Sequence, residues 1–123
     1  MEYLQLLIFD KRSWDNPEFH EGLIEGRKDA SVAENPQPLH GLVGQCAVCT
    51  EHNTLDQLSN LTAPTLVIGG ETDVFTPRWM ADEVHEKLPN STLHLYPRSG
   101  HAFHWENLED FNQRVAKHIS NNL

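Results

Sequence analysis

The hydrophobic positions of this chain follow two different patterns, one in each half. In the first half, apolar residues recur at helical spacing, most regularly where Leu39, Leu42, Val43 and Cys46 share one stripe. In the second half, two short apolar runs at 65–68 and 92–96 flank a segment with helical periodicity. The pattern predicts a helical N-terminal half followed by a βαβα unit.

Turn and cap residues divide the N-terminal half. Apart from Gln5, Tyr3–Phe9 is an apolar run, which fits either a strand or a buried helix. The segment Asn16–Glu18, with a proline at its centre, is typical of a helix start. The two prolines in 33–38 indicate a loop. Thr54–Gln57 matches a capping box, and we expect it to open a helix that carries Leu55, Leu58 and Leu61.

The second half predicts two parallel strands. The run 65–68 is continuously apolar, as in a strand covered on both faces. We expect a helix to begin at Thr76–Pro77, to carry Met80, Val84 and Leu88 on one face, and to end at Pro89–Asn90. The run 92–96 alternates, which places His94 toward solvent. A last helix carries Leu108, Phe111, Val115 and Ile119. A strand, helix and strand in this order imply parallel pairing.

Length and charge narrow the class of protein. The 123 residues fit one domain, although single α/β domains reach roughly 200–250 residues. We expect a helical cap-like segment at 1–53 and an α/β segment at 54–123, together forming one compact domain. A net charge of −9 argues against nucleic acid and anionic membranes as partners. The start Met1–Tyr3 lacks the features of a signal peptide, so we expect a cytoplasmic chain.

The candidate chemistry lies at the ends of the two predicted strands. Asp73 and His101 each follow a strand, at the sheet edge where α/β proteins bind ligands. A carboxylate beside a histidine fixes the imidazole tautomer and stabilises the imidazolium that forms on proton transfer. The alternatives are a turn carboxylate for Asp73 and an ordinary loop histidine for His101. Their joint placement after two strands favours the acid–histidine pair.

The run from Thr54 to Ile119 resembles the C-terminal part of an α/β-hydrolase, and residues 1–53 resemble its helical cap less specifically. The matching marks are Ala63–Gly70, Asp73, Pro77, Ala81, Leu88–Ser91, Gly100–His101, Glu106 and Phe111–Asn112. The resemblance implies a partial α/β-hydrolase fold, with Asp73 as the triad acid and His101 as the triad histidine. Asn107 departs from the proline that the family often has after the residue matching Glu106.

The nucleophile of such a triad is absent from the sequence. None of the six serines has the glycines of a G-x-S-x-G elbow, and the glycine-rich oxyanion loop is also absent. We therefore expect a hydrolase-like chain for small apolar esters or related acyl compounds, with the nucleophile supplied by another chain. The alternative is a non-catalytic binding or assembly module. We expect no cofactor.

Large side chains flank the acid and the histidine. They are Val74, Phe75, Trp79, Phe103, His104 and Trp105. They are predicted to line an apolar substrate pocket, or alternatively to form ordinary core and cap contacts.

The spacing of Cys46 and Cys49 raises three alternatives. Cys46 lies on the apolar stripe of its helix, which favours packing of the free thiol in a core. Zinc binding together with His101 and His104 matches no recognised ligand spacing, so we expect no metal site. A disulfide between residues i and i+3 of one helix has poor geometry.

The free edge of the predicted strand at 65–68 implies a partner. A two-stranded sheet is marginal by itself, and unpaired strand edges bind other chains. We expect either a homodimer or a partner chain that supplies the missing N-terminal half, unless a strand at Leu4–Phe9 covers this edge.

Overall fold

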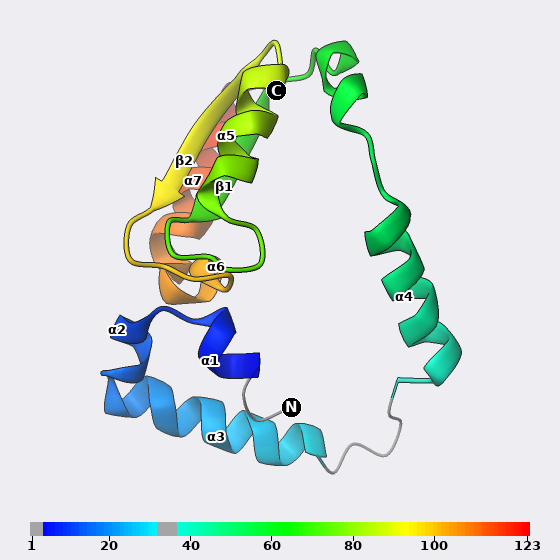
Figure 1. The fold of residues 1–123 in the computed structure, drawn as a ribbon. Coiled ribbons are helices and arrows are strands. Elements are labelled where there is room, and N and C mark those ends of the chain that lie inside the picture. Colours follow the sequence, from blue (N-terminus) through cyan, green and yellow to red (C-terminus); the bar gives the residue numbers. More distant parts are fainter. Residues whose placement is uncertain (1–3, 32–36) are drawn as a thin grey trace.

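The computed structural model describes residues 4–31 and 37–123, and within them the chain forms helices around one small sheet (Figure 1). The elements in chain order are α1 (Leu4–Ile8), α2 (Lys11–Trp14), α3 (Pro17–Ser31), α4 (Leu39–Glu51), the 3₁₀ helix η1 (Leu55–Asn60), β1 (Thr65–Gly70), α5 (Arg78–Lys87), β2 (Ser91–Tyr96), α6 (Phe103–Glu106) and α7 (Leu108–Asn121). This order confirms the α/β class and the βαβα unit in the second half.

The sheet consists of β1 and β2, which pair in parallel from Thr65 opposite Ser91 to Gly70 opposite Tyr96. Helix α5 connects the strands and covers one face, while α7 lies behind the other face (Figure 1). Side chains of β2 alternate accordingly. Leu95 lies on the α5 side beside Gly69, whereas Tyr96 bonds to Asp110 of α7. The strands thus end together, and their carboxyl ends meet at one edge.

Strand β1 is only half-buried, in contrast to the cover on both faces that its apolar sequence predicts. Residues 65–69 keep intermediate exposure, and Gly70 alone is buried. Among the described residues, β1 pairs with β2 only, so its outer edge has no strand beside it. Of the two alternatives for the apolar N-terminal run, the helix is correct: α1 spans Leu4–Ile8, so this run supplies no strand beside β1.

The N-terminal helices pack against the loop after β2. Phe9 is buried and its ring lies 5.0 Å from Phe19 and 6.1 Å from Trp105. Asn16 caps α3 as its sequence predicts, accepting from the backbone N–H of Glu18 at 3.1 Å. These contacts join residues 4–31 to the C-terminal unit.

Two sequence predictions concern the segment between the two halves of the chain. One falls mostly on residues that the structure does not describe, and the other is wrong. The predicted loop at 33–38 lies largely outside the described residues. The capping box at Thr54–Gln57 is wrong, because the Thr54 hydroxyl bonds to His52 Nε2 at 3.1 Å and η1 is a 3₁₀ helix. The backbone N–H of Gln57 bonds instead to the Thr54 carbonyl.

Helix α4 forms as predicted, but its apolar stripe is exposed. It lies away from the sheet (Figure 1), and Leu39 is 75% exposed. The core packing expected for Cys46 is therefore wrong, since both Cys46 and Cys49 are exposed free thiols. The helical period identifies an apolar face, but nothing in the described part of the chain covers it.

Apart from Leu88 at the end of α5, the best-buried described residues lie near the carboxyl ends of the strands, in the loop that follows β2 or in the N-terminal segment that packs there. The buried apolar residues are Phe9, Leu88, Tyr96 and Ala102, and the buried polar residues are Ser13, Asp73 and Ser99. Within the described residues, burial is thus greatest around the candidate site. None of the helices within 4–31 and 37–123 is long and apolar enough to span a bilayer.

Candidate active site

Asp73 lies in the turn that follows β1, and its carboxylate is held from several sides. Oδ1 accepts from the backbone N–H of Phe75 at 2.8 Å and of Thr76 at 3.0 Å. Oδ2 accepts from the Thr76 hydroxyl at 2.5 Å. The Asp73 side chain is only 1% exposed. The short span from Asp73 to Thr76 thus fixes the orientation of the carboxylate.

The charge state of Asp73 follows from these bonds. Burial by itself raises the pKa of a carboxyl group, but the hydrogen bonds from Thr76, His101 and Phe75 outweigh burial and hold the pKa of Asp73 below its ordinary value. Asp73 is therefore an anion at neutral pH, and an anion can only accept hydrogen bonds.

His101 lies in the loop after β2, and glycines allow that loop to pack closely. A Cβ at Gly70 would lie 2.3 Å from the carbonyl oxygens of Ser99 and Gly100. A Cβ at Gly100 would lie 2.5 Å from the Ile8 carbonyl oxygen. Arg98 turns the chain with a φ of 50°. Glycine at these two positions is thus required for the end of β1, the histidine loop and the N-terminal segment to meet.

The two side chains meet as the strand–helix–strand spacing predicts. His101 Nδ1 lies 2.9 Å from Asp73 Oδ2. Since the carboxylate can only accept, Nδ1 carries the proton, and in the neutral ring Nε2 is left as the acceptor. The His101 side chain is 46% exposed, so the imidazole ring is partly accessible. Chemically, the pair is arranged to accept a proton at Nε2.

The residues predicted to line a pocket fall into two groups. Phe75 packs edge-on against the His101 ring at 5.2 Å, and Val74 and Trp79 are exposed nearby in sequence. Phe103 instead stacks on Tyr96 at 6.0 Å, and both Phe103 and His104 lie beside Phe111. Trp105 packs on Phe9 and is otherwise exposed. A role in substrate binding stays a prediction for all of them.

Two cavities formed by described residues lie apart from the acid–histidine pair. A cavity of about 410 Å³ lies at the amino ends of the strands, between Pro64, Asn90, Arg114 and His118. A second of about 200 Å³ is lined by Arg12, Phe19 and Trp105 among others. Neither includes Asp73 or His101. These two cavities, formed by described residues, are therefore not built around the acid–histidine pair.

His94 differs from its predicted solvent-facing position. Its Nε2 is buried without a hydrogen-bond partner among the described residues, and its ring packs edge-on against Tyr96 at 4.5 Å. Burial, followed by the charge of Arg114, lowers the pKa of His94, while Asp110 acts in the opposite sense. The predicted alternation of β2 is correct, but the face that carries His94 packs toward α7 instead of facing solvent.

The zinc alternative finds no support in the described residues, where no cluster of three or more metal-binding side chains occurs.

Other contacts around the site carry no signal in the sequence. Glu106 accepts hydrogen bonds from the backbone N–H groups of Asp10 and Gly100, both at 2.7 Å. The first of these partners lies 96 residues away along the chain. No local pattern indicates such a pairing.

Comparison with known proteins places this arrangement in a family. Residues 32–121 match the TAP-like protein family. A hydrolase from Cupriavidus pinatubonensis, named for 2-hydroxy-6-oxononadienedioate and 2-hydroxy-6-oxononatrienedioate, is 37% identical over 110 residues, which are 88% of this chain and 38% of that protein. A hydrolase of the same name from Comamonas testosteroni is 28% identical over 122 residues, covering 98% of this chain and 41% of that protein.

A solved structure agrees with these relatives. The structure of Rv0554 from Mycobacterium tuberculosis superimposes with a TM-score of 0.84 at 26% identity, over 99% of this chain and 43% of that one. The chain thus spans about two fifths of the length of the proteins it matches. The chain belongs to the TAP-like protein family and corresponds to the C-terminal portion of an α/β-hydrolase.

Proposed function

We propose that this chain supplies the acid and the base of a serine-hydrolase site whose nucleophile comes from a different polypeptide segment. The observation that carries the proposal is the 2.9 Å contact between His101 Nδ1 and the buried Asp73 carboxylate, in a His101 side chain that is itself 46% exposed. The sequence contains no G-x-S-x-G elbow to provide the nucleophile within these 123 residues.

In this proposal each residue has a distinct task. Asp73 holds the His101 ring in the tautomer whose Nε2 lacks a proton, and it stabilises the imidazolium after proton transfer. His101 Nε2 takes the proton from an incoming serine hydroxyl and later returns it to the leaving group. The segment with the nucleophile also has to provide the oxyanion donors.

The proposed substrates are acyl compounds with an apolar portion. Two observations support this class. The curated relatives are named as hydrolases of hydroxy-oxo-dienedioates, compounds with a reactive carbonyl group. In this chain, three exposed apolar side chains follow the acid within six residues: Val74, Phe75 and Trp79. Apolar side chains at such a position can bind an acyl group once a second segment closes the site.

A chimeric enzyme tests the proposal. This chain replaces the matching C-terminal segment of the Cupriavidus pinatubonensis hydrolase, and turnover of a chromogenic ester is measured. We expect turnover that His101→Ala lowers at least about 1,000-fold. The matched control is His118→Ala, because His118 bonds to Pro64 at the other end of the strands. A folded chimera whose turnover is unaffected by His101→Ala would contradict the proposal.

The exposed stripe of α4 favours a second candidate, a binding or assembly module without catalysis. Leu39, Leu42, Val43 and Val48 are all exposed on this helix. An apolar helix face of this kind is typical of a protein contact. An inactive but well-folded chimera that still needs Asp73 only for stability would favour this alternative.

A further inference from the structure

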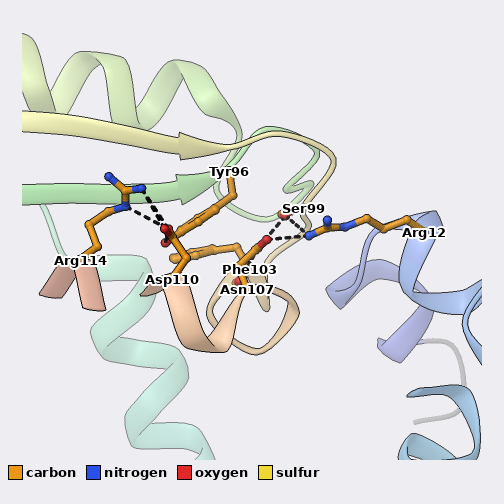
Figure 2. Close-up of polar contacts among 7 residues, drawn as sticks. All are labelled: Arg12, Tyr96, Ser99, Phe103, Asn107, Asp110 and Arg114. Atoms are coloured by element: carbon orange, nitrogen blue, oxygen red, sulfur yellow. Dashed lines mark hydrogen bonds and ion pairs between the residues drawn. The ribbon is translucent and has the colours of Figure 1, made fainter. Parts of the chain in front are cut away.

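One short N-terminal segment contacts the histidine loop through an arginine. Arg12 Nη2 donates to Ser99 Oγ and to Asn107 Oδ1, both at 2.9 Å (Figure 2). Ser99 is fully buried and lies two residues before His101. Asn107 Nδ2 also donates to Ser99 Oγ, at 2.9 Å. The guanidinium thus ties the start of α2 to the loop that carries the base.

The same segment contacts, through an aspartate, the turn between β1 and α5 that carries Asp73, which we call the acid loop. Asp10 Oδ2 accepts from the Thr72 hydroxyl at 2.7 Å, directly beside Asp73. Its other oxygen caps α2 by accepting from the Arg12 backbone N–H at 2.9 Å. Although burial raises it, the pKa of Asp10 lies below its ordinary value because of the bonds from Arg12 and Thr72. Asp10 is therefore an anion that accepts a hydrogen bond from Thr72 and caps the helix that carries Arg12.

Further bonds fix the histidine loop on either side of His101. Gly100 N–H donates to Glu106, whose other oxygen accepts from Ser13 Oγ and from the Asp10 backbone. The Ala102 N–H donates to the Ile8 carbonyl at 3.0 Å. Ala102 is therefore bonded directly to the N-terminal segment, and Gly100 is linked to the same segment through Glu106.

We propose that Asp10 and Arg12 are positioning residues that hold Asp73 and His101 at hydrogen-bond distance. Asp73 and His101 lie on separate loops, and a separation much beyond 3.2 Å weakens their bond steeply. Hydrogen bonds from one segment to both loops restrict their relative motion before any substrate binds. Such preorganisation is what an active site requires. Its importance for catalysis rests on the proposed function, but its effect on the Asp73–His101 contact does not.

The test reads the tautomer of His101 rather than turnover. Long-range ¹H–¹⁵N spectra of the full chain at pH 8, where unperturbed histidines are neutral, distinguish the Nδ1–H form from the Nε2–H form. His101→Gln assigns the signal. We expect the wild-type ring to be in the Nδ1–H form that donates to Asp73. Arg12→Gln and Thr72→Val should each shift the population toward Nε2–H, and Arg12→Lys should restore part of the wild-type signal.

Matched controls separate this effect from general loosening. Arg114→Gln removes the other arginine of Figure 2, which bonds to Asp110 in the first turn of α7. Thr92→Val makes the same substitution as Thr72→Val on exposed β2 surface. Both controls should keep the Nδ1–H form. An unchanged His101 tautomer in either Arg12→Gln or Thr72→Val, or an equal change in the controls, overturns the proposal, whether or not the chimera hydrolyses esters.

Discussion

The Asp73 carboxylate accepts four hydrogen bonds while its side chain is almost inaccessible to water. Hydrogen bonds to a charged group contribute about 1.5–3 kcal/mol each, and a buried group that loses its partners is costly. The residue therefore serves two purposes, since it orients His101 and it stabilises the turn after β1.

The acid limb of the stability curve tests the role of Asp73. Because the folded-state pKa of Asp73 lies below the unfolded value of about 3.9, its stabilisation is present above that pH and is lost as the pH falls through the folded-state pKa. We expect urea unfolding of Asp73→Asn to show a free energy lower by about 2 kcal/mol at pH 7. The loss of stability below about pH 4 should also be shallower. An identical pH profile for both proteins would show that Asp73 is not an ionised acceptor.

His94 leads to a prediction of the opposite sign. Its folded-state pKa is lowered by burial, so the unfolded chain takes up the proton first and wild-type stability falls as the pH drops through about 6.5. His94→Phe removes the buried nitrogen that lacks a partner and keeps the edge-on packing on Tyr96. We expect the free energy of unfolding to rise by about 1 kcal/mol at pH 8 and by more at pH 5.5. A destabilised variant at both pH values would argue for an unseen partner of Nε2.

Among the elements, α4 shows what periodicity can and cannot predict. The spacing of Leu39, Leu42 and Val43 correctly indicates a helix, because the 3.6-residue period depends on local geometry. Burial depends on what packs against that helix, and the sequence of α4 carries no information about it. The same holds for His94, whose exposure is decided by α7.

The pairing of Asp73 with His101 and the contacts made by Asp10 and Arg12 also differ in how far the sequence predicts them. Asp73 and His101 could be placed together from the sequence, because parallel strands bring their carboxyl ends to one edge. The contacts of Asp10 with Thr72 and of Arg12 with Ser99 span 62 and 87 residues and follow no local spacing. They depend on how the N-terminal helices pack on the finished βαβα unit.

The exposure of α4 is open to a chemical test. We expect both Cys46 and Cys49 to react with a thiol reagent such as DTNB in the native chain, at rates close to those in urea. Cys46→Ser should change the free energy of unfolding by less than about 0.5 kcal/mol, as for other surface substitutions. Strong protection of Cys46 in the native chain would show that α4 is covered, by this chain or by another copy.

For the whole molecule, the outer edge of β1 and the apolar face of α4 are the features that call for a partner. In the part of the chain that the structure describes, no second strand pairs with β1 at this edge, and an unpaired edge is a template for association with another chain. We expect sedimentation equilibrium at low micromolar concentration to show a homodimer, or a complex with the segment that carries the nucleophile when that segment is present. A stable, well-folded monomer in both conditions would contradict this expectation.

The most direct test of the central claim is covalent labelling of the chain alone with a fluorophosphonate probe, read as intact mass. Because Asp73 and His101 are proposed to form a base that lacks a nucleophile in this chain, we expect no stoichiometric adduct, while the chimera is labelled once in the segment from the relative. Labelling of one serine within these 123 residues, abolished by His101→Ala, would contradict the account.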